Sequence, residues 1–327
     1  MNFSVIGSGS WGTAVSYILA CNGHDVKLYS RRVEATEKMS LLRENADYLP
    51  GTVLPDNIAF TSDLKMAVTG ADIIIMAVPS HAVRQTASEI SQFCKTPVIL
   101  NIAKGIEQKT HLRMSQVIGQ EIPGADVAVM SGPSHAEEVV LGMPTTNIVS
   151  SRNVQLAKDI QHAVMTPMFR LYTNDDIVGV EVGGALKNVI ALCAGICDGL
   201  GFGDNTKAAL MTRGIAEITR LGCAMGAKRE TFAGLSGIGD LIVTCTSMHS
   251  RNRRAGILIG KGMTADEAVK EVKMVVEGIK TADAAYALSK KYNVEMPIVS
   301  EAYRIVFENK PANDAVLDLM IRNEKSE

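Results

Sequence analysis

Short apolar runs, separated by polar and glycine-containing turns, fill the first half of the chain. Their Ile- and Val-rich character is typical of strands in a parallel sheet that is buried on both faces. The runs lie within residues 3–6, 26–29, 71–81, 96–107 and 126–138, and two further strand candidates follow at 145–151 and 169–175. Ligands of such sheets collect at the carboxyl ends of the strands, so the turns that follow these runs are the first places to look for a site.

Beyond residue 176 the pattern changes to long segments with helical spacing of apolar positions. These segments are 177–199, 205–226, 264–272, 278–291, 297–308 and 312–321. The chain shows no internal repeat and no flexible linker. We therefore predict an α/β protein in which a Rossmann-type parallel-sheet domain, residues 1–176, is followed by an all-helical domain, residues 177–327.

A glycine motif lies between the first two predicted strands. The stretch "VIGSGSWGTA" (5–14) follows the strand at 3–6, and small and apolar residues then recur at helical spacing up to residue 19 before the strand at 26–29. The motif glycines are Gly7, Gly9 and Gly12. A G-x-G-x-x-G sequence inside a βαβ unit of about 30 residues predicts a dinucleotide-binding turn.

Each glycine has a separate purpose in such a unit. Gly7 would allow the sharp turn, Gly9 would let the backbone approach a pyrophosphate, and Gly12 would let the helix lie close to the strand. The first turn of the helix, with Ser10 and Trp11, would then face the phosphates. A tight turn that binds nothing is the alternative.

The end of the second strand, "LYSRR", predicts which dinucleotide binds. Enzymes that use NAD usually place an acidic residue here against the ribose hydroxyls. This chain has Ser30 at that position, followed by Arg31 and Arg32, which could hold a 2′-phosphate. We predict NADP as the preferred cofactor. NAD remains the alternative, in which both arginines only occupy a solvated helix start.

Composition excludes several other classes of function. The 327 residues are 46% hydrophobic and 21% charged with a net charge of −2, which argues against a nucleic-acid-binding protein. A strand that starts at residue 3 leaves no room for a secretory signal, and no apolar run approaches a membrane span, so we expect a cytoplasmic protein. Six cysteines form no CxxC pair or zinc-ligand spacing, so Cys193 and Cys197 are expected to be reduced core residues, and no metal is expected.

Lys187 is the most unusual residue of the helical half. Its neighbours one and two turns away are small or apolar and offer no ion-pair partner. Snorkelling at a helix edge is the commoner explanation for such a lysine. The many glycines nearby, such as Gly183 and Gly195, instead suggest that something approaches this helix, and a partly desolvated lysine suits proton transfer.

Two further stretches supply polar groups. Ser250, Arg251 and Asn252 open a run of donors, "SRNRR", that suits a phosphate, although a solvated helix face would look the same. Asp240 could hold a substrate hydroxyl or orient Lys187, or it could simply cap a helix. Lys104 and the turn "SGPSHAEE" (131–138) come from strand ends that should face the same cleft.

These stretches together resemble a known family. "GSGSWGTA", "AKGIE", "SGPSHAEEV", "GALKNVIALCAGICDGLGFGDNTKAALMTRG", "GLSGIGDLIVTC", "SRNRRAG" and "VVEGIKTA" are similar, in order and approximate spacing, to the bacterial type of NAD(P)-dependent glycerol-3-phosphate dehydrogenase. The resemblance covers nearly the whole chain. It implies reversible reduction of a small-molecule substrate, dihydroxyacetone phosphate, to sn-glycerol 3-phosphate, which supplies phospholipid synthesis. Whether the protein forms a homodimer is left open.

The resemblance also implies roles for individual residues. Lys187 would be the catalytic proton donor or acceptor. The implied cofactor contacts are Ser10, Trp11, Arg31, Arg32, Lys104, Ala136, Arg251, Val275 and Glu277. The implied substrate contacts are Lys104, Gly132, Ser134, Lys187, Asp240, Ser250, Arg251 and Asn252.

Two positions depart from the family pattern, and two other functions stay open. Cys193 replaces the usual small residue in the lysine helix, and His135 replaces a common Phe in the glycine-proline turn. A β-hydroxyacid or 6-phosphogluconate-type dehydrogenase also pairs a Rossmann domain with a helical domain and a lysine. A cofactor-sensing protein without catalysis is the alternative from a different class.

Overall fold

The computed structural model describes residues 1–324. The chain forms two compact units: residues 1–104 with 112–181, and residues 105–111 with the chain from 182 onward. The observed division adds the short segment 105–111 to the second unit and leaves the first residues of its first long helix with the first unit. Each unit is described by itself below.

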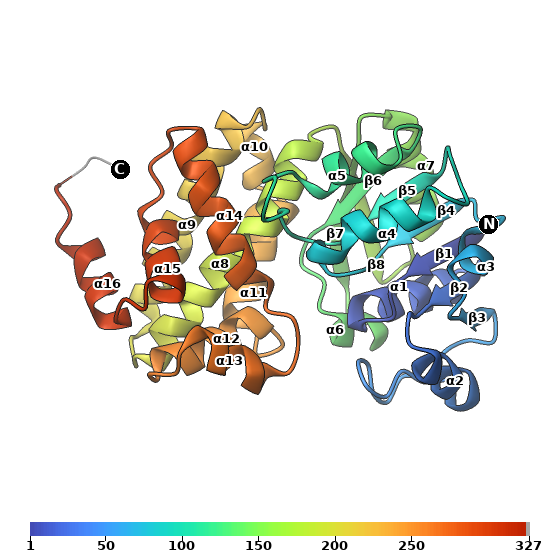
Figure 1. Ribbon diagram of the computed structural model, residues 1–327, viewed down its shortest axis with the longest axis horizontal. Helices are drawn as coiled ribbons and strands as arrows, with labels where there is room; N and C mark the ends of the chain where they lie inside the picture. The colour runs from blue at the N-terminus through green and yellow to red at the C-terminus, as the bar shows by residue number, and fades with distance from the viewer. Residues whose placement is uncertain (325–327) are drawn as a thin grey trace. The chain divides into compact units, whose positions relative to one another are not determined.

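The first unit is built on one eight-stranded sheet (Figure 1). The strands are β1 (Asn2–Ile6), β2 (Asp25–Tyr29), β3 (Ile58–Thr61), β4 (Ile73–Met76), β5 (Val98–Asn101), β6 (Asp126–Ser131), β7 (Thr145–Ser151) and β8 (Phe169–Asn174). Their order is β3-β2-β1-β4-β5-β6-β7-β8. All seven predicted strands are present. The patterns missed β3, because it has only four residues and only its two end residues, Ile58 and Thr61, are buried.

The sheet is not parallel throughout. β7 runs antiparallel to β6, whereas β7 and β8 are parallel to each other. The helix between β6 and β7, α6 (Ala136–Val140), has five residues. At about 1.5 Å per residue it cannot carry the chain back along a strand of about 20 Å, as a parallel connection would require. The sequence predicted the strand but not this reversal.

Helices cover both faces of the sheet (Figure 1). They are α1 (Ser10–Cys21), α2 (Val33–Leu42), α3 (Leu64–Val68), α4 (Val83–Ile90), α5 (Met114–Glu121), α6 and α7 (Val154–Val164), with a 3₁₀ turn, η1 (Ser80–Ala82). Val15 of α1 belongs to the core on one face, with Val5 of β1. Val83 of α4 belongs to the core on the other face, with Met76 of β4. The strands are apolar on both sides for this reason.

The second unit is helical. Its elements are α8 (Ile177–Gly199), α9 (Asp204–Ala224), α10 (Arg229–Phe232), a π-helical turn η2 (Leu235–Gly239), α11 (Asp240–Thr246), α12 (Arg251–Gly260), α13 (Ala265–Val272), α14 (Glu277–Lys291), α15 (Pro297–Phe307) and α16 (Ala312–Met320). All six predicted helices are present. The patterns did not predict α10, α11 or α12: α10 and α11 are short, and α12 begins with four polar residues and contains Gly256 and Gly260.

α8 is the central apolar helix. Among the described residues it alone is long and apolar enough to cross a membrane by length and composition, and 94% of its most apolar window is buried inside the fold. A core helix is buried in this way, so the length and apolar composition of α8 are only weak evidence for a membrane span. The expectation that no apolar segment approaches the length of a membrane span is therefore wrong for α8 by length and composition alone.

The glycines of α8 make room for protein backbone. A Cβ at Gly195 would lie 2.0 Å from the carbonyl oxygen of Arg253 and 2.9 Å from the Cα of Gly256. A Cβ at Gly199 would lie 2.9 Å from the Cα of Gly260. α8 and α12 therefore cross in direct backbone contact. The sequence analysis took these glycines as space for an approaching group, and the group at these two positions is α12 itself.

Candidate active site

The glycine-rich turn joins β1 to α1, as predicted. Gly7 has φ +119°, and a Cβ there would lie 2.8 Å from the carbonyl oxygen of Ala77. A Cβ at Gly12 would lie 2.0 Å from the carbonyl oxygen of Gly7. Gly9, the N-cap of α1, faces open space within 4 Å among the described residues. The three glycines thus provide a turn, a close helix–strand contact and an open approach, which fits a dinucleotide pyrophosphate.

A loop that no pattern in the sequence indicated braces this turn. The Asn45 side chain is 5% exposed and donates hydrogen bonds to the Ser8 carbonyl oxygen and the Thr13 hydroxyl, both at 2.8 Å. The Ser10 hydroxyl donates to the Tyr48 carbonyl oxygen at 2.7 Å. Segment 43–54, which contains Asn45 and Tyr48, is therefore fixed against the start of α1. The "NADY" letters gave no periodic signal that could have revealed it.

The two arginines after β2 are exposed at the start of α2. The Arg32 guanidinium lies 5.7 Å from the centre of the Tyr48 ring and 3.7 Å from the Asp47 carboxylate. Arg31 is exposed beside it. Both interpretations of the sequence, a 2′-phosphate site and a solvated helix start, place the arginines here.

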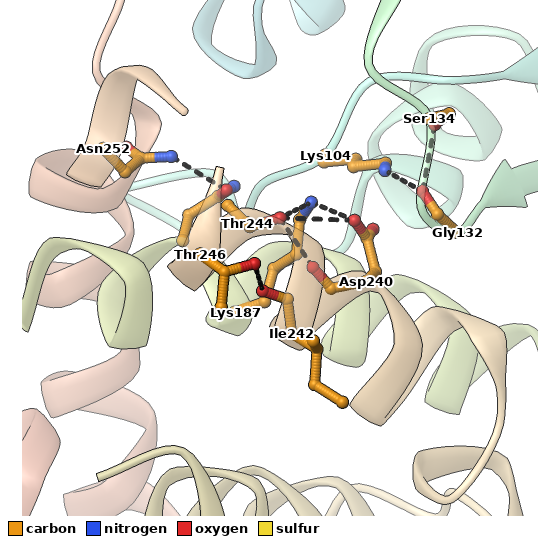
Figure 2. Close-up of polar contacts among 10 residues, drawn as sticks. Lys104, Gly132, Ser134, Lys187, Asp240, Ile242, Thr244, Thr246 and Asn252 are labelled. Atoms are coloured by element: carbon orange, nitrogen blue, oxygen red, sulfur yellow. Dashed lines mark hydrogen bonds and ion pairs between the residues drawn. The ribbon is translucent and has the colours of Figure 1, made fainter. Parts of the chain in front are cut away.

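The ends of β5 and β6 meet, as their positions in the sheet predict. Lys104 Nζ donates to the Gly132 carbonyl oxygen at 2.9 Å, and the Ser134 hydroxyl donates to the same oxygen at 2.9 Å (Figure 2). Gly132 has φ +142°, and a Cβ there would lie 2.3 Å from the Asn147 side-chain oxygen, so only glycine fits. Ala136 follows as the first residue of α6. His135 is the N-cap of that helix.

Lys187 is buried in α8 and is held by two side chains from α11. Its residue exposure is 6%, its ammonium forms an ion pair with the Asp240 carboxylate, and it donates to the Thr244 hydroxyl at 2.7 Å (Figure 2). The Thr244 hydroxyl in turn donates to the Asp240 carbonyl oxygen at 2.6 Å. Lys187 does not snorkel.

Asp240 fits the orienting role that was one of its three interpretations. It is the first residue of α11, and Gly239 takes the capping position. The Lys187–Asp240 pair joins residues 53 apart in the chain. The helix of Lys187 itself offers no ion-pair partner one or two turns away, and Asp240 was expected to orient the lysine only as one of its alternatives; the ion pair in the structure agrees with that alternative. Thr244, one turn after Asp240, was missed.

Three buried thiols of the second unit are kept neutral by burial. Burial raises the pKa of Cys245 to about 12 and that of Cys197 to about 11, and it raises the pKa of Cys193 well above its ordinary value. All six cysteines are free thiols. Cys193 and Cys197 are therefore buried core residues, as predicted. Among residues 1–324, no group of three or more His, Cys, Asp or Glu residues could hold a metal ion.

Asn252 is built into the packing around α8. It is 8% exposed, its side-chain amide donates to the Asn188 side-chain oxygen at 2.9 Å, and its own oxygen accepts the Gly278 N–H at 2.8 Å. Asn188 follows Lys187 directly, and Gly278 lies in the first turn of α14. Asn252 thus ties the lysine helix to the start of α14.

The residues around Asn252 divide between structural and exposed positions. The Ser250 hydroxyl caps α12 by accepting the Arg253 N–H, and Arg253 pairs with Asp198 at 2.7 Å. Arg251 is exposed. Glu277 is the first residue of α14, directly before Gly278, and Val275 lies two residues before that helix. Of the expected donors, Arg251 is therefore the one whose side chain is open to solvent.

Known proteins match this chain along its full length. The model of the NAD-dependent glycerol-3-phosphate dehydrogenase N-terminus matches residues 2–157, and that of the C-terminus matches residues 176–317. A glycerol-3-phosphate dehydrogenase [NAD(P)+] of Agathobacter rectalis is 55% identical over 324 residues, covering 99% of this chain and 96% of that protein. One of a Thermoanaerobacter species is 55% identical over 328 residues, covering 100% and 99%.

A solved structure agrees. The crystal structure of glycerol-3-phosphate dehydrogenase from Coxiella burnetii superposes with a TM-score of 0.95 at 37% identity, covering 98% of this chain and 99% of that one. The glycine turn, the buried lysine and the matches to both family models point the same way. The chain belongs to the family of NAD-dependent glycerol-3-phosphate dehydrogenases.

Proposed function

We propose that the protein catalyses the reversible NAD(P)H-dependent reduction of dihydroxyacetone phosphate to sn-glycerol 3-phosphate and so supplies glycerophospholipid synthesis. The observation that carries this proposal is the buried group of Lys187, Asp240 and Thr244. A lysine that is 6% exposed and held by a carboxylate and a hydroxyl is positioned for proton transfer. The names of relatives at 55% identity support the substrate and both cofactors.

The first unit binds the cofactor in this proposal. When bound, the nicotinamide supplies the hydride that adds to C2 of the substrate. Gly7, Gly9 and Gly12 let the N-terminus of α1 approach the pyrophosphate, where its N–H groups and helix dipole favour negative charge. Arg31 and Arg32 hold the 2′-phosphate of NADP. Ser10, Trp11 and Ala136 line the remaining length of the cofactor.

The second unit acts on the substrate. Lys187 donates its proton to the C2 oxygen as negative charge develops there, and it takes the proton back in the oxidative direction. Asp240 and Thr244 position the Lys187 ammonium. Arg251 and Asn252, at the start of α12, bind the phosphate together with the helix N-terminus that Ser250 caps.

Several other assignments come from the family resemblance. Lys104 contacts both cofactor and substrate, Gly132 and Ser134 line the substrate, and Val275 and Glu277 line the cofactor. We assign the dinucleotide-binding turn to the domain of residues 1–176 and proton transfer to the domain of residues 177–327, with the contacts above contributed from both. The proposed location is the cytoplasm and the proposed assembly is a homodimer, which gel filtration with light scattering tests.

The test is NADPH oxidation with dihydroxyacetone phosphate, compared with NADH at the same concentration. Lys187→Ala and Lys187→Arg are assayed beside the unchanged protein. Arginine keeps the positive charge but releases no proton near neutral pH, so both variants should lose about 10²- to 10⁴-fold in kcat. Both should still bind NADPH, because the glycine turn is untouched.

One result would overturn the role of Lys187 as proton donor, and another would overturn the assigned substrate. One is retention of most of the turnover by Lys187→Arg, which would mean that charge suffices. The other is a preference for 6-phosphogluconate or a β-hydroxyacid over dihydroxyacetone phosphate, which would place the protein with a different dehydrogenase class.

A further inference from the structure

The end of β2 has no carboxylate of its own, but a neighbouring segment supplies one. Ser30 stands where enzymes that use NAD carry an acidic residue. Asp47, in segment 43–54, places its carboxylate 3.7 Å from the Arg32 guanidinium and 3.0 Å from Lys38 Nζ. The hydrogen bond from Lys38 lowers the pKa of Asp47, so its carboxylate is charged at neutral pH.

The position of Asp47 is fixed relative to the glycine turn. Asn45, two residues before it, donates to the Ser8 carbonyl oxygen at 2.8 Å. The backbone carbonyl oxygen of Tyr48, directly after it, accepts a hydrogen bond from the Ser10 hydroxyl at 2.7 Å, and the Tyr48 ring lies under the Arg32 guanidinium. Contacts on both sides therefore hold the Asp47 carboxylate beside the end of β2, where the adenosine ribose of a bound dinucleotide lies in a Rossmann unit.

We propose that Asp47 is a specificity-determining residue that lowers the preference for NADPH over NADH by competing with the 2′-phosphate for Arg32. The proposal rests on the cofactor site proposed above. A 2′-phosphate shares the Arg32 guanidinium with Asp47, which lies 3.7 Å from it, and the phosphate also meets the negative charge of that carboxylate. NADH has a 2′-hydroxyl and needs no such sharing. Asp47 therefore weakens the binding of one cofactor and not of the other.

The size of the effect follows from exposure. The side chains of Arg32 and Asp47 are 53% and 44% exposed, so water and salt screen their interaction. Exposed ion pairs of this kind change equilibrium constants by up to about fivefold. Asp47→Asn should therefore tighten NADPH binding by about two- to fivefold at low salt, and by less at high salt, with NADH unchanged.

The experiment measures dissociation constants for NADPH and NADH by fluorescence titration of the full-length protein without substrate. Asp47→Asn is compared with Asp159→Asn, which removes the same charge from an exposed position on α7. Both substitutions are also made in an Arg32→Ala background. The expected result is a gain for NADPH in Asp47→Asn alone, no gain in Asp159→Asn, and loss of the gain when Arg32 is absent.

Two outcomes contradict the proposal. An equal gain for NADH would mean that Asp47 acts on the shared part of the cofactor, and a gain that persists in full without Arg32 would mean that Arg32 is not the route. If Arg32→Ala weakens NADPH while Asp47→Asn changes nothing, only this inference fails. If removing Arg31 and Arg32 together leaves NADPH binding unchanged, the proposed 2′-phosphate site itself is wrong.

Discussion

Replacing Asp240 by asparagine removes the negative charge beside Lys187 but keeps the shape of the side chain. The ion-pair side chains of Lys187 and Asp240 are 8% and 1% exposed, so little water screens the ammonium once the carboxylate is gone. Removing one partner of a buried pair costs about 3–5 kcal/mol, which is about two to four powers of ten in the folding equilibrium. Asp240→Asn should lose stability on that scale.

A second variant calibrates the loss. Thr244→Val removes the hydroxyl that Lys187 contacts at 2.7 Å but keeps the carboxylate. A hydrogen bond to a charged group contributes about 1.5–3 kcal/mol, so this variant should lose less stability than Asp240→Asn. Activity should follow the same order, because a displacement of about 1 Å in a reacting group can reduce the rate about 10²-fold.

The assays are urea unfolding followed by circular dichroism at pH 7, and kcat for dihydroxyacetone phosphate with saturating NADPH. The NADPH dissociation constant serves as the control, since the glycine turn is unaltered. If Asp240→Asn stays within about 1 kcal/mol of the unchanged protein and within about threefold in kcat, the ion pair neither stabilises the fold nor positions the lysine, and the reasoning fails.

Three further outcomes are expected. Arg251→Ala should raise KM for dihydroxyacetone phosphate about 10- to 150-fold and leave the poor substrate dihydroxyacetone unchanged in kcat/KM, because a charged hydrogen bond to phosphate is lost; equal losses would place the arginine elsewhere. Gly195→Ala puts a Cβ 2.0 Å from the Arg253 carbonyl oxygen and should lower the melting temperature by an amount equivalent to about 1–3 kcal/mol or more, whereas Gly119→Ala, with open space in α5, should not. Burial raises the pKa of Glu217 to about 7, so the folded protein binds this proton more tightly than the unfolded chain does. The free energy of unfolding should therefore fall by about 3 kcal/mol as pH rises from 4.5 to 7. Glu217→Gln should flatten this pH dependence in urea titrations, and an unchanged pH dependence would contradict the assignment.

The features that could be predicted from sequence are local ones. Gly7, Gly9 and Gly12 fall within six residues, so their spacing alone defines the turn that the structure shows. The long apolar period of α8 likewise predicted its bounds, Ile177–Gly199, without error. Both signals depend on neighbours in the chain.

The features that could not be predicted join distant residues. Asp240, the partner of Lys187, lies 53 residues away, and the sequence predicted this pairing only as one of three alternatives; the side chain that Asn188 contacts lies 64 residues away. Neither separation corresponds to a helical or strand period. The direction of β7 could not be predicted either, because it depends on the short connection through α6 and not on the composition of the strand.

The glycine contacts between α8 and α12 limit the distance between two groups that the proposed mechanism uses. The proposed proton donor lies on α8 and the proposed phosphate anchor lies on α12, and the two helices touch backbone to backbone at Gly195 and Gly256. Helices in such contact cannot come closer, so no substitution at the crossing can shorten the span between proton donor and anchor. A larger side chain there would force the two backbones apart, with the loss of stability expected above for Gly195→Ala. The close crossing therefore fixes the distance between α8 and α12, and with it the relative positions of the proposed proton donor and the proposed phosphate anchor.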